Sequence, residues 1–219
     1  MNPVFAILKD NPLFTGIALG DFQRMMTCLS AKTSSFAKDE ILLLTGDAVS
    51  SVGLILRGGV RILKEDREGR ATILTELSAG EIFGEVFACA GIVLSPVTIQ
   101  ATEATEILAI DYRRIISSCG SACPFHTQLI ANMLKLIAMK TLMLNQKLEI
   151  LSKRSTREKL LAYFDLQRGA TSRFSIPFNR EELANYLCVD RSAMSAELGR
   201  MRDEGLIRYT RNEFELLKG

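Results

Sequence analysis

The sequence has little of what enzyme active sites and membrane segments require. One histidine, His126, is present in 219 residues, and neither a G-x-S-x-G motif nor a local cluster of metal ligands occurs. The chain is therefore not expected to be an enzyme. No apolar run approaches the roughly 18 to 20 residues that a membrane-spanning helix needs. The first residues lack a basic segment followed by an apolar core, so we also expect no secretion signal.

Cysteine is scarce and scattered. The five cysteines are Cys28, Cys89, Cys119, Cys123 and Cys188. An odd, dispersed set argues against a disulfide framework and favours a reducing cytoplasm. An iron–sulfur cluster needs about four clustered cysteines, and haem needs an axial ligand such as histidine or cysteine. We therefore interpret His126 as a polar residue of a helix and Cys89 as a small core residue, with a thiol redox switch at Cys89 as the alternative.

Positive charge is concentrated in the C-terminal third. The whole chain has 27 Lys and Arg against 25 Asp and Glu, a net charge of +2. Residues 153–219 alone have 13 basic and 10 acidic residues, so the remainder of the chain is slightly acidic. The length is sufficient for two domains, each with its own core. The charge distribution is compatible with nucleic-acid contact by the C-terminal segment.

The middle of the chain has the pattern of a β-rich domain. Residues up to about 35 show helical spacing, with Asp21 as a plausible N-cap, and residues 40–77 then form short β-rich runs separated by turn signals. Gly58-Gly59 predicts a tight hairpin, and the stretch around Gly69 predicts a looser one. Many short strands at this spacing favour a sandwich or a barrel.

A long helix follows, from Pro124 to Leu151, without any glycine or further proline. Apolar residues recur along it at heptad spacing, which predicts a coiled-coil seam and a parallel homodimer. The seam residues are Ile130, Leu134, Ile137, Thr141, Leu144, Leu148 and Leu151. A second apolar face, suited to packing on the chain's own β-rich domain, contains Leu129, Met133, Leu136, Leu142 and Met143.

The C-terminal third predicts two short helices joined by a tight turn and followed by a β-hairpin. A preceding helix ends at Gly169. Asn179 and Glu182 form a capping-box pattern, and Asp190 is placed to cap the next helix. Apolar residues then give each helix one inward face: Leu183, Tyr186 and Leu187 in the first, and Met194, Leu198 and Met201 in the second. This arrangement is typical of a winged helix-turn-helix.

These modules together resemble the CRP/FNR family of bacterial transcription regulators. The resemblance rests on "GEVFACAGIVLSPV", the long heptad helix, and "REELANYLCVDRSAMSAELGRMRDEGLI", in that order. It implies an α+β chain with an N-terminal β-sandwich (a jelly roll of the cyclic-nucleotide-binding type), a long dimerisation helix and a C-terminal winged helix-turn-helix. We place the sensor domain at residues 1–123, the dimerisation helix and hinge at 124–152, and the DNA-binding domain at 153–219.

The resemblance also implies that helix Arg191–Arg202 enters the DNA major groove and that a homodimer reads a palindromic site. By analogy with the family, RNA polymerase is a further partner. Ala196 departs from the family pattern, because many members have an arginine there, and this bears on target sequence and affinity. The side chains expected to contact bases or phosphates are Arg180, Arg191, Ser192, Ser195, Arg200 and Arg211.

The candidate effector pocket lacks a cation. In nucleotide-binding members of the family, a glutamate after the turn glycine binds ribose, and an arginine with a small polar residue binds the cyclic phosphate ten positions later. Gly84 and Glu85 match the glycine and the ribose-binding glutamate, but Ser95 and Pro96 occupy the positions of the phosphate-binding arginine and its small polar neighbour. No Lys, Arg or His occurs between Ala71 and Tyr112. A buried phosphate without a cationic partner is costly.

The dimer helix supports the same interpretation. Leu142 and Met143 are apolar where nucleotide binders of the family place hydroxyl side chains toward the base. We therefore expect that cyclic AMP is not the effector, and that an unidentified small organic molecule, or no ligand, takes its place. Arg57 or Arg61, on a neighbouring strand, is the alternative source of a cation for a phosphate.

The sequence thus predicts a cytoplasmic, homodimeric, DNA-binding transcription regulator controlled by an unidentified small effector. The alternative is a ligand-independent or protein-interaction module of the same fold with weakened DNA binding.

Overall fold

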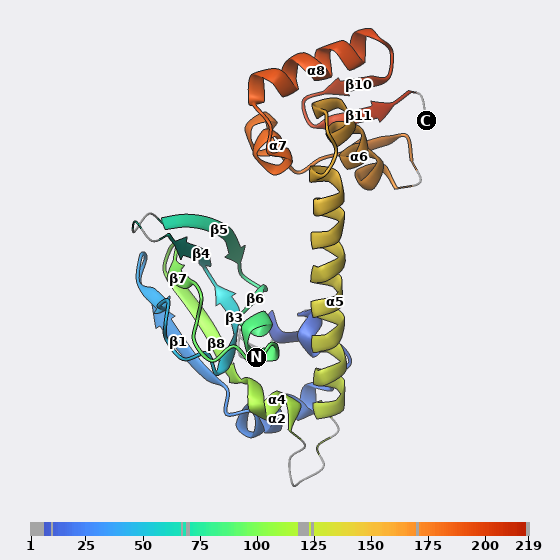
Figure 1. Ribbon diagram of the computed structural model, residues 1–219. Coiled ribbons are helices and arrows are strands. Elements are labelled where there is room, and N and C mark those ends of the chain that lie inside the picture. Colours follow the sequence, from blue (N-terminus) through green and yellow to red (C-terminus); the bar gives the residue numbers. More distant parts are fainter. Residues whose placement is uncertain are drawn as a thin grey trace. The chain divides into compact units, whose positions relative to one another are not determined.

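The computed structural model describes residues 7–9, 11–66, 68, 71–117, 123, 125–169 and 171–217 (Figure 1). The chain folds into two compact units, Met1–Ala138 and Met139–Gly219, and the division falls within helix α5 (Phe125–Leu151). The domain boundaries that the sequence suggested, after residues 123 and 152, remain predictions. Among the described residues, no helix combines the length and hydropathy needed to cross a lipid bilayer.

The first unit begins with short helices, as predicted, but they end at Cys28, and residues 32–35, which the prediction included, belong to strand β1 (Lys32–Phe36). Ile7–Lys9 is helical and is followed by η1 (Pro12–Phe14), η2 (Leu19–Asp21) and α2 (Phe22–Cys28). The Asn11 side chain accepts a hydrogen bond from the Leu13 amide at 2.9 Å and donates one to the Gly80 carbonyl at 2.6 Å. Asp21 lies at the start of α2, but its carboxylate accepts from Arg24 and caps no amide.

Eight strands form two antiparallel four-stranded sheets, in the orders β1-β8-β3-β6 and β2-β7-β4-β5. Side chains from both sheets meet in one buried cluster that includes Ile55, Val60 and Ile99. This is the predicted β-sandwich. The strands are β1 (Lys32–Phe36), β2 (Ile41–Leu43), β3 (Ser51–Arg57), β4 (Gly59–Glu65), β5 (Ala71–Ser78), β6 (Ile82–Phe83), β7 (Thr98–Ala101) and β8 (Thr105–Asp111).

The predicted tight hairpin at Gly58-Gly59 is wrong. β3 and β4 belong to different sheets, so the two glycines form a corner between the sheets. Gly58 has φ +80°, and a Cβ there would lie 2.6 Å from the Ala104 carbonyl oxygen. The Thr105 hydroxyl accepts from the Gly59 amide at 3.2 Å and donates to the Gly59 carbonyl at 2.9 Å. The glycines therefore permit close approach to the start of β8.

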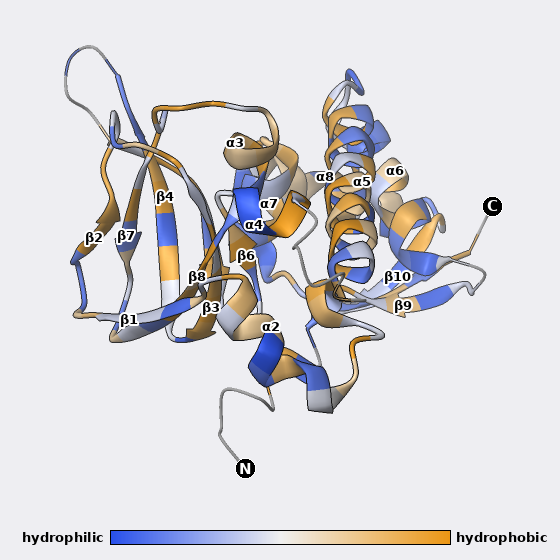
Figure 2. Ribbon diagram, turned by 90° about the horizontal axis from the view of Figure 1, so that it is seen from below, coloured by the Kyte–Doolittle hydropathy of each residue, from blue (hydrophilic) through white to orange (hydrophobic). Residues whose placement is uncertain are grey.

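The second hairpin is confirmed, because β4 and β5 pair antiparallel along their length. Gly69 lies outside the described residues. β4 carries both hydrophobic and hydrophilic residues (Figure 2), and in its first half Arg61 stands between Val60 and Ile62. Val60 and Ile62 pack in the cluster between the sheets, so Arg61 points to the opposite face. β3, in contrast, is buried along most of its length, because one of its faces packs against the other sheet and the other against the helices.

Three helices complete the first unit and lead into the second: α3 (Glu85–Cys89), α4 (Tyr112–Ile116) and α5. Leu129 and Met133 of α5 are buried in the core formed with the N-terminal helices, and Leu136 packs against it. The prediction that Leu129, Met133 and Leu136 pack on the chain's own first domain is therefore confirmed. Pro124, the predicted first residue of the helix, lies outside the described residues.

The second unit is a winged helix-turn-helix, as predicted. Its three-stranded antiparallel sheet has the order β10-β11-β9. One core joins the sheet to the helices and includes Tyr163, Phe164, Leu183, Met194 and Phe214. The elements are α6 (Thr156–Arg168), β9 (Arg173–Ser175), α7 (Arg180–Leu187), α8 (Arg191–Asp203), β10 (Ile207–Thr210) and β11 (Glu213–Leu216).

Candidate nucleic-acid interface and effector pocket

The turn between α7 and α8 is built from local signals that the sequence displays. Asn179 and Glu182 form a complete capping box at the start of α7. Cys188 ends α7 with φ +51°, which reverses the chain direction. The Asp190 carboxylate then accepts a hydrogen bond from the Ala193 amide at 2.8 Å and so starts α8. These two caps confirm the predicted helix boundaries.

One face of α8 is buried and the other is exposed. Met194, Leu198 and Met201 are almost inaccessible to solvent, as predicted. The opposite face has exposed side chains, which we call the α8 face: Arg191, Ser192, Ser195 and Arg200, together with Ala196. Polar side chains on the outward side of the second helix can reach base edges in a major groove.

Three polar residues of the α8 face, Arg191, Ser192 and Arg200, have partners within the chain. Arg191 Nη1 lies 3.5 Å from Glu181 Oε2, and both side chains are well exposed. The Ser192 hydroxyl donates to Asp190 Oδ1, and this bond together with the Ala193 amide lowers the pKa of Asp190. Because these are exposed contacts, they are weak and can be exchanged for contacts with another molecule.

The far end of α8 is held by a group of charges that joins it to α6. Arg157 donates from Nη1 and Nη2 to the two carboxylate oxygens of Glu204, each at 2.8 Å, and from Nε to the nearly buried Glu197. Arg200 pairs with the same Glu197 at 2.7 Å. The bonds to Arg157 lower the pKa of Glu204, and the bonds to Glu204 and Glu197 raise the pKa of Arg157.

Arg180 lies between α7 and the wing, the β10–β11 hairpin. Its guanidinium carbon is 5.0 Å from the centre of the Tyr209 ring and 5.1 Å from that of Phe214. Its Nη2 donates to the Arg211 carbonyl at 2.9 Å, and burial lowers the pKa of the guanidinium. Arg180 thus holds the wing tip, where Arg211 is exposed with φ +54°. Phosphate contacts by these two residues remain predictions.

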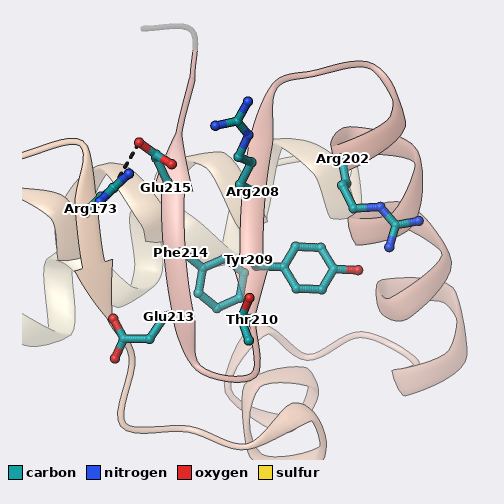
Figure 3. Close-up of a pocket in the computed structure, with 8 residues that line it drawn as sticks. All are labelled: Arg173, Arg202, Arg208, Tyr209, Thr210, Glu213, Phe214 and Glu215. Carbon is teal, nitrogen blue, oxygen red and sulfur yellow. Dashed lines mark hydrogen bonds and ion pairs between the residues drawn. The ribbon is translucent and has the colours of Figure 1, made fainter.

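Three basic residues that the sequence did not single out lie on or beside the wing: Arg208 on β10, Arg202 on α8 and Arg173 on β9. Figure 3 shows Arg202 and Arg208 near β10 and β11. Both line an open hollow with a volume of about 580 Å³. Arg173 also lines it and is bound to Glu215 at 3.0 Å. Alternation along β10, with Ile207 buried and Arg208 exposed, is the signal that identifies Arg208 as outward-facing.

In the candidate effector pocket, Gly84 and Glu85 are buried and do not face solvent. Gly84 begins α3 with φ +79°, and a Cβ there would lie 3.0 Å from the Ser51 carbonyl oxygen. Glu85 is only 2% exposed. Ser95 is equally buried, and its hydroxyl donates to the Val97 carbonyl at 2.6 Å, whereas Pro96 is exposed. The Ser95 hydroxyl is therefore committed to the chain's own backbone.

The cavity between the sheets is small and uncharged. It has a volume of about 200 Å³, below the range of about 300–1,000 Å³ of most ligand pockets, and its lining includes Leu42, Phe83, Gly84 and Ile107. None of the residues that line it is charged. Arg61, one of the two cations left open by the sequence, binds Asp39 at 2.7 Å and Gln100 at 2.9 Å on the outer face of β4.

Leu142 and Met143 lie in the second unit and are exposed on α5. Their part in an effector pocket remains a prediction.

Cys89 is exposed, so its interpretation as a core residue is wrong. Helix α3 ends at Cys89, and the outward side of this one-turn helix is not covered. Burial, together with a bond to Cys89, raises the pKa of Tyr112.

The predicted dimer seam is largely uncovered within one chain. Leu134, Leu144 and Leu148 are 64%, 58% and 56% exposed, and Thr141 is exposed as well. Ile130, Ile137 and Leu151 are partly buried, and Ile137 packs against the core of the first unit. A row of exposed leucines at heptad spacing leaves apolar area for a partner helix to cover.

Two family models match the chain. One is described as a cyclic nucleotide-binding domain and matches residues 33–120. The other is described as a Crp-like helix-turn-helix domain and matches residues 158–218. The first covers the two-sheet part of the first unit, and the second covers most of the winged unit.

Similar proteins agree with these matches. Transcriptional activator protein FnrA of Stutzerimonas stutzeri is 24% identical over 187 residues, which are 82% of this chain and 74% of that protein. The Thermus thermophilus Catabolite Activator Protein has a TM-score of 0.54 at 22% identity, covering 94% of this chain and 93% of that chain. The c-di-GMP-responsive global regulator CLP of Xanthomonas campestris has a TM-score of 0.56 at 17% identity, covering 92% and 100%. These structural matches establish the fold.

Proposed function

Because the chain belongs to the CRP/FNR family of bacterial transcription regulators, we propose that it binds a palindromic DNA site as a homodimer and that its effector is not cyclic AMP. The family consists of transcription regulators, and the chain carries their DNA-binding helix-turn-helix. By the same analogy, RNA polymerase is the protein partner.

The observation that carries the DNA-binding proposal is the division of α8 into two faces. Its methionines and Leu198 are buried in the core of the winged unit, so the helix cannot turn without losing that packing. The α8 face is therefore held outward, with Arg191 at the N-terminal end, where a recognition helix reaches base edges. Two such helices, related by a twofold axis, read half-sites about 34 Å apart.

Replacing Arg191 tests the recognition helix. Arg191→Ala is expected to weaken binding to the selected palindromic site by about 1–3 kcal/mol, because a guanidinium on guanine or phosphate is lost. Affinity is measured by fluorescence anisotropy at fixed, physiological salt. Arg168→Ala is the matched control, since Arg168 pairs with Asp165 on α6 and lies outside the α8 face. Unchanged affinity in Arg191→Ala contradicts the assignment.

The effector proposal rests on the uncharged cavity between the sheets. A cyclic phosphate needs a cation, but Arg61 is bound to Asp39 on the outer face of β4, and Ser95 binds the backbone. A nucleotide is also too large for a cavity of about 200 Å³. We therefore assign the pocket to a small, uncharged, largely apolar molecule, or to no ligand.

Titration calorimetry with cyclic AMP and cyclic GMP tests this part of the proposal. We expect no binding heat from the wild-type protein. Ser95→Arg, which places a guanidinium at the position of the missing cation, is the comparison. Micromolar binding of either nucleotide by the wild-type protein contradicts the proposal and requires a cation that reaches the pocket from elsewhere.

A second candidate function is a ligand-independent or protein-interaction module with weakened DNA binding. Ala196 and the ion pairs that engage Arg191 and Arg200 favour it, because fewer unpaired cations face outward on α8. Selection from a random DNA library separates the two functions. Enrichment of a palindrome bound at nanomolar concentration removes this alternative, and the absence of any enriched sequence supports it.

A further inference from the structure

Three potential metal ligands lie together where α2 meets the start of α5, within the first unit. Cys28 is the last residue of α2, Cys123 lies just before α5, and His126 is in the first turn of α5. Their sulfur and imidazole nitrogen atoms all lie within 4.8 Å of one another. The contact between Cys28 and His126 spans 98 positions in the sequence, so the packing of α2 against α5 creates this group.

The distances in this group are close to those of a tetrahedral metal site. Cys28 Sγ lies 3.9 Å from His126 Nε2. Metal–sulfur bonds of about 2.3 Å and metal–nitrogen bonds of about 2.0 Å, at tetrahedral angles, separate the two ligand atoms by about 3.5 Å. The Cys123 carbonyl accepts from the His126 amide at 3.3 Å, which holds these two residues one helical turn apart. The Cys28–His126 pair is within a few tenths of an ångström of this value, and the other ligand atoms, within 4.8 Å, need to approach by at most about 1 Å.

The environment of His126 independently indicates a ligand. The residue is only 5% exposed, and among the described residues none offers a hydrogen-bond partner to its Nδ1. The Phe125 ring lies 4.7 Å from the imidazole, centre to centre. A buried ring nitrogen without a partner is rare in proteins and costs free energy. Nε2 is the ring nitrogen that faces Cys28, and a 180° turn of the ring, which exchanges Nδ1 with Cδ2, is the alternative assignment.

We propose that Cys28, Cys123 and His126 bind one divalent transition-metal ion of the zinc type, with water at the fourth position. Thiolate and imidazole ligands select such ions over Mg²⁺ and Ca²⁺, which prefer oxygen. Binding releases the two thiol protons to solvent, so two thiolates balance the ion's double charge and the site is neutral. A hollow beside Cys28 and Cys123, lined also by Asp21, Arg24 and Thr27, gives water access to the fourth position.

The ion cross-links the N-terminal helices to the start of the long helix. Because it binds the folded chain and not the unfolded one, it stabilises the first unit by an amount that rises with the logarithm of its free concentration. This inference does not depend on the identity of the DNA site or of the effector.

Anaerobic titration of the reduced full-length protein with Co²⁺ tests the site. Cobalt takes the place of zinc in thiolate sites and produces a thiolate-to-cobalt charge-transfer absorption. We expect one cobalt ion per chain, displaced by Zn²⁺, and a loss of affinity of about 100-fold or more in Cys28→Ser and in Cys123→Ser. Cys89→Ser and Cys188→Ser, at exposed cysteines outside the group, are the matched controls and are expected to retain binding.

Three results overturn the proposal: no cobalt uptake by the wild-type protein, uptake unchanged in Cys28→Ser, or assembly of an iron–sulfur cluster in place of a single ion. A second measurement needs no variant and so does not depend on how a variant folds. Zn²⁺ is expected to slow alkylation of Cys28 and Cys123 in the wild-type protein at least about tenfold, while Cys89 and Cys188 continue to react. Equal rates with and without Zn²⁺, measured by peptide mass, contradict the proposal.

Discussion

Gly53 and Phe83 determine how much space remains between the two sheets. A Cβ on Gly53 would lie 2.1 Å from the Phe83 ring, so the ring rests directly on the glycine backbone. Phe83 also lines the small cavity beside Gly84. The sequence displays both residues, but nothing local indicates that an aromatic ring from one strand covers a glycine of another.

Gly53→Ala is expected to destabilise the protein by about 1–3 kcal/mol, because the added methyl group displaces a buried ring from a filled core. Thermal unfolding of the full-length protein measures the effect. Gly20→Ala is the matched control in the same unit, since a Cβ there would meet no atom within 4 Å. Equal stability of the two variants would show that Phe83 moves freely, in which case the cavity volume is adjustable.

Arg180 illustrates how far the sequence can predict a charged residue. The capping box places it correctly in the first turn of α7. Its contact with Tyr209 and Phe214, about thirty positions later, depends on the wing folding back over α7. A position on a helix follows from local pattern, whereas the partner of a long side chain does not.

At the scale of elements, α6 is joined to the end of α8 by an ion pair between Arg157 and Glu204, which requires that the Glu204 carboxyl group is ionised. Bonds from Arg157 lower the pKa of Glu204. The pKa of Glu204 is thus lower in the folded than in the unfolded protein, so ionised Glu204 favours folding. This contribution is fully present above the ordinary pKa of about 4.3 and is lost as the pH falls through the lower, folded value.

Glu204→Gln is therefore expected to lower the thermal stability at pH 7, and this difference from the wild-type protein is expected to disappear as the pH falls through the lowered pKa of Glu204. Unfolding is followed at fixed protein concentration between pH 7 and pH 3. Glu213→Gln, on the wing and outside this group of charges, is the control and should change little at any pH. A stability difference that stays constant from pH 7 to pH 3 would contradict the role of the ionised carboxylate.

At the scale of the whole molecule, α5 packs on the core of each unit near its two ends and exposes apolar side chains between them. Leu129 and Met133 are buried in the first unit, and Ile150 is buried in the second. Between them, leucines at heptad spacing are exposed. Packing within the chain therefore covers both ends of the helix, and the proposed homodimer would cover the middle.

Charges introduced into the exposed part of the seam test the homodimer. The double variant Leu144→Glu, Leu148→Glu is expected to sediment as a monomer, because like charges oppose one another across a parallel pair of helices. Both leucines are exposed within one chain, so the variant should remain folded. Gln146→Glu, exposed on the same helix but outside the seam, should remain dimeric. A dimer that persists in the double variant places the interface elsewhere.

Regular elements and their order could be predicted because their signals lie within a few residues. The side chains of Asn179 and Asp190 accept hydrogen bonds from nearby backbone amides and so start α7 and α8 locally, and helical spacing alone assigns Met194 to the buried face. The same is true of the heptad pattern on α5. Capping and periodicity act over one or two helical turns, so the sequence displays them directly.

Contacts between distant segments could not be read in this way. Gly58-Gly59 resembles a hairpin turn, but pairing with the rest of the chain makes it a corner between two sheets. Cys28, Cys123 and His126 are separate in the sequence and come within 4.8 Å only when α2 packs on α5. The free energy that brings such groups together comes from burying apolar area around them, so no local pattern reports their position.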